Sequence, residues 1–333
     1  MIERLLCLTA LLLPGVAHSA DPKAALSATG VPSGLSVPAG AAAAGFTTLA
    51  LNSDFTQQLP TNWLGGCPNG PDGLPNRLSD NTGHIWWNNI WWAPTNSACN
   101  VTQRNDPHYG GLVLDIPWLV AKADSAAKIL QTGSWDYDAS KGIGEVHSFP
   151  KNAYYEQIAQ STPNAPSNGF NMITWGVGGM RNQSQAGIEW DVVETSGSDS
   201  RMYDSAVHNW GAGGTTSWIW TSDQLRQTFP NYDASKYHKF GLRTTSDGTN
   251  DAACGYVDNV LINCVPLPGG LTDAEKTERE FVLMGLFCFP QNYNGSCPLE
   301  GQVAHMLVKS VRVWSCKDWQ TSQCNGPVLS GAP

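Results

Sequence analysis

Short apolar stretches alternate with polar, turn-rich segments along this chain from Phe46 onward. Short runs of apolar or alternating residues that are bounded by Gly, Pro, Asn and Ser are typical of β-strands. The clearest predicted strands are 46–51, 112–114, 154–159, 170–177, 206–210, 217–220, 239–243, 255–258, 281–289 and 305–314. Many short strands with turns between them predict an all-β sandwich.

Two segments have helical rather than strand features. Apolar residues from Asp115 to Gln131 have helical spacing, with Pro117 near the start and Gly133 after the end. Residues 272–275 read Thr-Asp-Ala-Glu, the capping-box pattern that begins many helices. We therefore expect one or two short helices beside the strands.

One predicted strand carries three carboxylates, Glu189, Asp191 and Glu194, among strand-forming residues. Side chains alternate between the two faces of a strand, so Glu189 and Asp191 share a face. Glu194 comes five positions after Glu189 and would point to the opposite face on a regular strand. One β-bulge at 192–193 would add a residue and bring all three acids to the same face.

Carboxylates this close together point to acid–base chemistry. Neighbouring negative charges disfavour one another's ionisation, so one acid of the group keeps its proton near neutral pH. Two glutamates on a bent strand can also approach the separation of roughly 5–5.5 Å that retaining cleavage of a glycoside needs. An edge strand that turns its acids into water is the alternative interpretation.

The composition narrows the class of protein. Charged residues make up only 14% of the 333 residues, and the formal net charge is −9. An acidic chain poor in Lys and Arg is not typical of proteins that bind nucleic acid or anionic membranes, so we expect neither as a partner. The 34 Gly, 21 Pro and 14 Trp residues fit a β-protein with long loops.

The N-terminus predicts an exported protein. Arg4 precedes an apolar run from Leu5 to Val16, and a small-residue cleavage site follows, so residues 1–20 are predicted to be a signal peptide. The apolar run is too short to span a bilayer. Residues 21–45 are rich in Ala, Gly, Ser and Pro and are expected to form a disordered linker. We expect the mature protein to be secreted, in an extracellular or periplasmic location.

The cysteines agree with export. One of the nine, Cys7, leaves with the signal peptide, and the even number that remains suggests disulfides. Close spacing suggests the pairs 254–264, 288–297 and 316–324, which leaves 67–99. There is no Cys-x-x-Cys and no His pair with metal spacing, so a zinc site is not expected.

Tryptophans gather in residues 86–92, which read Trp-Trp-Asn-Asn-Ile-Trp-Trp within a loop-like region. Their flat faces suit the apolar face of a sugar ring. A small satellite core that packs over the loop is the other interpretation, and the sequence leaves both open.

With its three acids in the order Glu189, Asp191 and Glu194, the chain resembles glycoside hydrolase family 16. The signature of that family is Glu-x-Asp-x-x-Glu in the form that carries a β-bulge. Further segments that resemble the family in the same order are 205–211, 237–241, 256–258 and 306–314. The chain departs from the family pattern at Asn171, where a Trp is usual, and at Trp190, where an aliphatic residue is usual.

The resemblance covers about residues 46–316. It implies one catalytic domain with a β-jelly-roll sandwich of two antiparallel sheets, like that of concanavalin, followed by a C-terminal tail at 317–333. It also implies retaining hydrolysis of internal β-glycosidic bonds in a polysaccharide, either a β-1,3- or mixed-linkage glucan or a galactan.

The same resemblance assigns roles to the acids. Glu189 is expected to be the nucleophile and Glu194 the general acid and then the general base. Asp191 lies between them, where it can hydrogen-bond Glu189, hold its rotamer and tune its charge.

Three further residues are expected to face the cleft and bind substrate. Trp175 and Trp210 are candidates for stacking on sugar rings, and His208 for a hydrogen bond to the nucleophile or to a sugar hydroxyl. Each could instead be a structural residue. No cofactor is required for the reaction that the resemblance implies, a structural calcium ion is possible, and a monomer is expected.

Three other interpretations remain open. A carbohydrate-binding lectin on the same fold would use the tryptophans but has no need for three acids on one face. A transglycosylase would pass the sugar to a hydroxyl group instead of water. A secreted structural protein that has lost activity would not need an intact set of acids.

Overall fold

The structure of residues 1–333 is a computed structural model. It describes residues 34–55, 76–79, 85–88, 102–106, 111–117, 126–132, 148–161, 170–178, 187–195, 203–210, 214–233, 236–246, 251–267, 279–288, 301 and 303–328. The predicted signal peptide, 1–20, lies outside these residues. Among the described helices, none is both long enough and apolar enough to cross a membrane.

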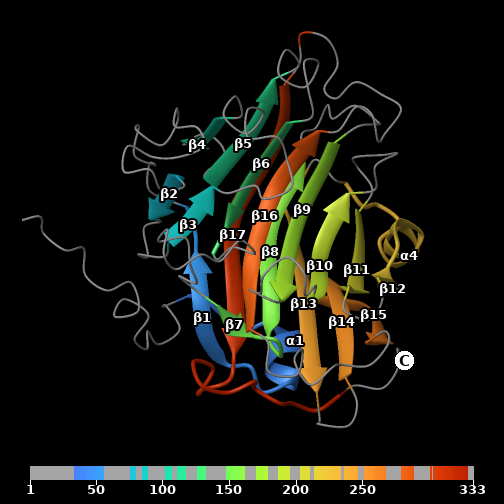
Figure 1. The fold of residues 1–333 in the computed structure, drawn as a ribbon. Helices are drawn as coiled ribbons and strands as arrows, with labels where there is room; N and C mark the ends of the chain where they lie inside the picture. The colour runs from blue at the N-terminus through green and yellow to red at the C-terminus, as the bar shows by residue number, and fades with distance from the viewer. Residues whose placement is uncertain are drawn as a thin grey trace, which may run out of the picture.

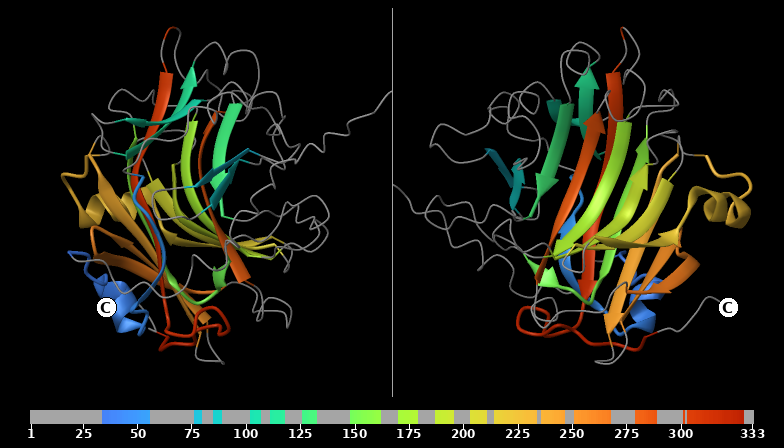
Figure 2. Two further views of the ribbon diagram at one scale, coloured as in Figure 1. Left: turned by 90° about the vertical axis from the view of Figure 1, so that its left-hand side faces the viewer. Right: turned by 45° about the vertical axis from the view of Figure 1, so that its right-hand side comes forward.

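Two antiparallel sheets form the described part of the molecule, and they appear as two curved layers (Figure 1, Figure 2). We name each sheet after one of its strands. The β13 sheet has the order β15 (Val260–Pro266), β14 (Asp251–Val257), β13 (His238–Ser246), β8 (Tyr154–Ser161), β17 (Val303–Ser315), β5 (Gly111–Pro117) and β4 (Thr102–Asp106), and β1 (Thr48–Ser53) also pairs with β17. The β10 sheet has the order β12 (Thr215–Trp220), β11 (Tyr203–Asn209), β10 (Ile188–Thr195), β9 (Phe170–Gly178), β16 (Arg279–Cys288), β6 (Ala126–Gln131), β3 (Ile85–Asn88) and β2 (Asn76–Ser79), and β7 (Phe149–Pro150) also pairs with β16. The predicted jelly-roll sandwich of antiparallel sheets is confirmed.

Large apolar side chains fill the space between the sheets. Trp190, Trp220 and Trp314 are fully buried, and so is Trp86. The indole N–H of Trp86 donates to Ser53 Oγ over 3.0 Å, which ties β3 to β1. Trp86 therefore belongs to the main core and not to a satellite core over a loop. Residues 89–92 lie outside the described part.

The helix predicted from Asp115 to Gln131 is wrong. The first residues of that range belong to β5 and the last to β6, while 118–125 lie outside the described residues. Leu112 and Leu114 of β5 alternate into the core, and β5 pairs with β17 whereas β6 pairs with β16. These long-range pairings override a local spacing that also suits a helix.

The segment before Phe46 is not the disordered linker that the composition predicts, at least from residue 34 on. It contains the helix α1 (Ala39–Ala43), in which Gly40 and Ala41 are buried. A Cβ at Gly40 would overlap the ring of Tyr256, so only glycine lets the helix pack this closely on the β13 sheet. The Ala- and Gly-rich sequence therefore makes a tight contact here, while residues 21–33 lie outside the described part.

A second helix, α4 (Ser222–Thr228), follows β12 (Figure 1). Its N-cap Thr221 accepts from the Gln224 backbone, and the Gln224 side chain accepts from the Thr221 N–H, which completes a capping box. The other capping-box pattern, at 272–275, lies outside the described residues.

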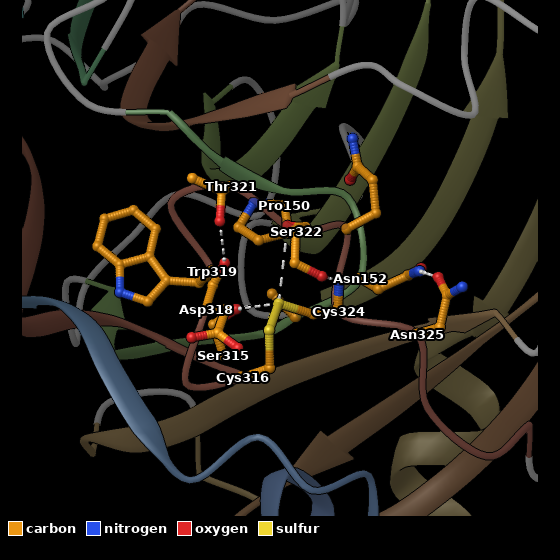
Figure 3. The surroundings of a disulfide bond; sticks show 12 residues. Pro150, Asn152, Ser315, Cys316, Asp318, Trp319, Thr321, Ser322, Cys324 and Asn325 are labelled. Atoms are coloured by element: carbon orange, nitrogen blue, oxygen red, sulfur yellow. Dashed lines mark hydrogen bonds between the residues drawn. A yellow bond between two sulfur atoms is a disulfide. The ribbon is translucent and has the colours of Figure 1, made fainter.

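The C-terminal segment packs against the sandwich through residue 328 and is not a free tail. Trp319 is almost buried and stacks on Phe149 with 5.8 Å between ring centroids. Arg279 donates to the Trp319 carbonyl oxygen. Asn152 donates to Asn325 (Figure 3). The domain therefore extends past the boundary expected at residue 316.

Two of the predicted disulfides are confirmed. Cys254 pairs with Cys264 across β14 and β15, and Cys316 pairs with Cys324 beside the C-terminal segment (Figure 3). The predicted pairs 288–297 and 67–99 involve side chains outside the described part and stay predictions.

Candidate active site

The predicted β-bulge is present on β10. Asp191 pairs with Ala206 of β11, and Glu194 pairs with Asp204. Two residues of β10, Val192 and Val193, therefore lie opposite one residue of β11. Both valines are buried.

The pairing of β10 with β9, the strand on its other side, shows the same bulge. Asp191 pairs with Trp175 of β9, and Val193 pairs with Thr174, so Val192 is the extra residue against β9. A buried side chain supports the bulge from β11, since Ser205 Oγ donates to the Asp191 carbonyl oxygen over 2.6 Å. This contact holds the backbone of β10 where the strand changes its alternation.

The acids and the apolar residues of β10 divide between its two faces. Ile188 and Trp190 belong to the core between the sheets. Glu189 and Asp191 alternate with them and therefore share the opposite face of the β10 sheet. The bulge restores this face for Glu194, which is the most exposed of the three acids.

Trp210 contacts Glu189 directly. Its indole Nε1–H donates to Glu189 Oε2 over 2.6 Å. The indole also stacks on the ring of His208, with centroids 5.2 Å apart and planes 12° apart. The Trp210 side chain remains 42% exposed, so a hydrogen bond to the acid coexists with a free aromatic surface.

The His208 side chain lies against Asp191, although its backbone pairs with Glu189 across β10 and β11. Its Nε2 is 2.9 Å from Asp191 Oδ2, and its Nδ1 is 2.7 Å from Thr216 Oγ1 on β12. The imidazole therefore has a polar neighbour at each nitrogen, one on β10 and one on β12. The prediction that His208 contacts the nucleophile or a sugar hydroxyl thus acquires a third possibility, in which it orients Asp191.

The Asp191 carboxyl is almost completely buried, and among the described residues no donor faces it with hydrogen-bond geometry. Even the 2.9 Å approach of His208 Nε2 lacks that alignment. Burial, and then the charge of Glu189 and a hydrogen bond to it, raise the pKa of Asp191 well above its usual range. These facts favour an Asp191 that is protonated and shares its proton with Glu189.

The other two acids differ in how strongly their pKa values are raised. Burial raises the pKa of Glu189, but the hydrogen bond from Trp210 and the nearby His208 oppose the rise. Burial, followed by the charges of Asp191 and Glu189, raises the pKa of Glu194 well above its usual range. The site therefore favours one negative charge, on Glu189, and a proton on Glu194.

Asp204 is a neighbour of Glu194 that the sequence pattern does not predict. It pairs with Glu194 across β10 and β11, and its negative charge contributes to the raised pKa of Glu194. Its Oδ1 accepts from the backbone N–H of Ser222 over 2.6 Å and from the Ser222 hydroxyl over 2.8 Å. Only the register of β10 against β11 reveals this neighbour, because ten residues separate the two acids in the chain.

Trp175 lies opposite Asp191 on β9, as its predicted role requires, but its side chain is outside the described part. Its stacking role stays a prediction. No group of three His, Cys, Asp or Glu residues within the described ranges could hold a metal ion, so the structural calcium also stays a prediction.

No family model matches the sequence, and no curated protein matches it. Solved structures do resemble it. A GlcNAcα1-4Gal-releasing endo-β-galactosidase from Clostridium perfringens is 16% identical with a TM-score of 0.51, over 81% of this chain and 63% of that chain. A mutant of SCLam, a non-specific endo-β-1,3(4)-glucanase from family GH16 that was co-crystallised with 1,3-β-D-cellotriosyl-glucose, is 14% identical with a TM-score of 0.51, over 80% of this chain and 94% of that chain. The chain has the fold of glycoside hydrolase family 16.

Proposed function

We propose that this protein is a secreted, retaining endo-glycoside hydrolase that cleaves internal β-glycosidic bonds of a polysaccharide. The observation that carries the proposal is the β10 bulge, which brings Glu189, Asp191 and Glu194 to one face of the sheet. The pKa directions support different tasks for these acids, since Glu189 is the acid best stabilised as an anion and Glu194 is the one that holds a proton near the rim. One anionic and one protonated carboxyl are the pair that double displacement requires.

In the first step Glu189 attacks the anomeric carbon of the bound sugar and forms a glycosyl ester. The bond between that carbon and the bridging oxygen breaks, and Glu194 gives its proton to the departing oxygen. The negative charge thereby moves from Glu189 to Glu194. Trp210 holds Glu189 by a hydrogen bond to Oε2, so the carboxylate needs little reorganisation.

In the second step water attacks the same carbon and breaks the ester. Glu194 is an anion at this stage, because the charge of Glu189 that raised its pKa is gone while the ester lasts, and as an anion it can take a proton from the water. Glu189 leaves as a carboxylate, which regenerates the starting state with the original anomeric configuration. All atoms and protons balance without a cofactor.

The test is a screen of the wild-type protein on laminarin, mixed-linkage glucan, agarose and carrageenan, with measurement of new reducing ends. We expect internal cleavage of a β-glucan or a galactan into oligosaccharides whose first-formed anomer is β, as proton NMR of fresh product would show. Binding without release of reducing ends on every glycan would favour a lectin. Products longer than the substrate would favour a transglycosylase.

Two variants separate the proposed roles of the glutamates. Glu189→Ala removes the nucleophile and should abolish cleavage of every substrate, by a factor of about 10³ or more. Glu194→Ala removes the proton donor, so it should lose polysaccharide cleavage but keep the first step on an aryl glycoside whose leaving group needs no proton. Two outcomes would contradict the assignment. The first is an equal loss of cleavage activity by both variants on both substrates, and the second is near wild-type turnover of the polysaccharide by either variant.

A further inference from the structure

Trp218 of β12 is an exposed tryptophan to which the proposed mechanism gives no task. Its side chain is 53% exposed, more than any other large apolar side chain in the described part of the molecule. Trp210, directly after β11, is the next most exposed aromatic there. The strands β11 and β12 follow β10 toward the edge of the β10 sheet, which ends at β12.

The register places Trp218 on the face of the acids. Trp218 pairs with Ala206 of β11, and Ala206 pairs with Asp191 of β10. Residues directly opposite each other on antiparallel strands share a face, so these three residues form one row. The row continues the face from the catalytic strand to the sheet edge.

The next residues of β12 point the other way. Ile219 and Trp220 are fully buried, and both would contact a Cβ placed at Gly255 of the β13 sheet. Their side chains therefore fill the space between the two sheets and fix β12 against the β13 sheet. Trp218 is left on the solvent side of an edge strand that is fixed by its core contacts.

The distance between Trp218 and Asp191 suits a sugar ring that lies next to the cleaved bond. Two interstrand spacings separate Trp218 from Asp191, which is about 9.6 Å between Cα atoms. A chain of sugars bound at Glu189 and extending across the strands would therefore pass over the Trp218 indole. The exposed indole needs no change of conformation to receive it.

The surrounding chemistry favours a neutral sugar. The strands β10, β11 and β12 contain no Lys or Arg, and their charged residues are the acids Glu189, Asp191, Glu194 and Asp204. The exposed neighbours of Trp218 on β12 are hydroxyl residues, Thr215 and Thr216, and not further apolar side chains. Exposed indoles among hydroxyl groups and acids are typical of a sugar platform, whereas a protein-docking site shows a contiguous apolar patch.

We propose that Trp218 is a stacking platform for a neutral pyranose ring next to the cleaved bond, on the β12 side of the three acids. This inference rests on the proposed function, because it uses the acids of β10 as the point of cleavage. It makes Trp218 a residue that selects for substrate length and for uncharged sugars. The reaction itself proceeds on other residues.

The kinetic test compares Trp218→Ala with Trp218→Tyr and the wild type on the polysaccharide and on a ladder of oligosaccharides from it. Loss of one stacking contact should raise KM about tenfold on the polysaccharide, with a far smaller change in kcat. The loss in kcat/KM should grow with oligosaccharide length, and the tyrosine should restore most of it. Val260→Ala, an exposed residue of the β13 sheet, is the control and should leave KM unchanged.

A loss that is the same for every oligosaccharide length, or a KM unchanged by Trp218→Ala, would overturn the platform. Affinity electrophoresis in gels that contain neutral or sulfated glycans separates this failure from a failure of the proposed hydrolysis. If the wild type cleaves nothing but a neutral glycan retards it more than it retards Trp218→Ala, the platform stands and the enzyme assignment fails. Equal retardation of both proteins, no retardation of either, or stronger retardation by the sulfated glycan would overturn the platform.

Discussion

At the scale of single residues, the site has to keep three neighbouring acids from repelling one another, and Glu189 and Asp191 are buried. Burial raises the pKa of all three acids. The rise is opposed most directly at Glu189, because the Trp210 N–H donates to it. Asp191 has no comparable donor among the described residues, and its pKa is raised well above the usual range by burial and by the charge of Glu189. The same arrangement leaves the proton of Glu194 available to a leaving group.

Asp204 gives a residue-scale prediction about pH. Its negative charge raises the pKa of Glu194, so Asp204→Asn should lower that pKa while its Oδ1 still accepts from Ser222. A general acid is lost as the pH rises through its pKa, and the basic limb of kcat/KM should therefore move to lower pH. The measurement is the pH profile of kcat/KM on the cleaved polysaccharide for the variant and the wild type.

The control for this prediction is Asp223→Asn. Asp223 is an exposed acid on α4, next to Ser222, and is paired with Arg226 over 2.6 Å. Its removal should leave the pH profile where it is. A basic limb that coincides for Asp204→Asn and the wild type would show that Asp204 serves only to bind the start of α4.

At the scale of the secondary-structure elements, one inserted residue on β10 decides whether the acids can act together. Without the bulge Glu194 would point toward the core. Val192 and Val193 are buried, and Ser205 on β11 donates to the Asp191 carbonyl oxygen inside the bulge. The shared face of the three acids therefore depends on a hydrogen bond from a strand that contributes no proposed catalytic group.

Ser205→Ala tests this dependence. It leaves a buried carbonyl oxygen without its donor, so the free energy of unfolding should fall by about 1–3 kcal/mol. Since the bulge also aims Glu194, kcat should fall at least about tenfold in protein that is still folded. Denaturant unfolding and kcat on the polysaccharide measure the two effects, and Ser217→Ala on β12 is the matched control. A stability loss with kcat unchanged would mean that the bulge holds without Ser205.

At the scale of the whole molecule, the sequence predicts the features that depend on neighbouring residues within one strand. Strand alternation predicts the shared face of Glu189 and Asp191, and the odd spacing to Glu194 predicts the bulge. The strand pairs β5–β17 and β6–β16 join segments far apart in the chain, and no local pattern in 115–131 reports them. The Asp204–Glu194 contact was missed for the same reason, because it exists only once β10 and β11 are in register.

The helix α1 and the C-terminal segment were missed for another reason. Small residues such as Gly40 and Ala41 suggest disorder by composition, yet smallness is what lets α1 pack against Tyr256. Trp319 becomes part of the core only because Phe149 and Arg279 are brought to it by the sandwich. Both terminal segments pack on the sandwich through tertiary contacts, which the amino-acid composition does not predict.

The contact between the two sheets gives a prediction for the whole molecule. Gly255 of β14 faces Trp220 of β12 so closely that a Cβ would overlap the indole, and Ile219 lies beside it. Gly255→Ala should therefore push the sheets apart and lower the free energy of unfolding by about 1–3 kcal/mol. In a Trp220→Leu background the same change should cost less, since the smaller side chain leaves room for the methyl group, with a coupling of about 0.5–3 kcal/mol in a double-mutant cycle. Because β12 also carries Trp218, the single variant should raise KM on long substrates more than on short ones. Strictly additive unfolding free energies would show that the Gly255–Trp220 contact does not set the spacing of the sheets.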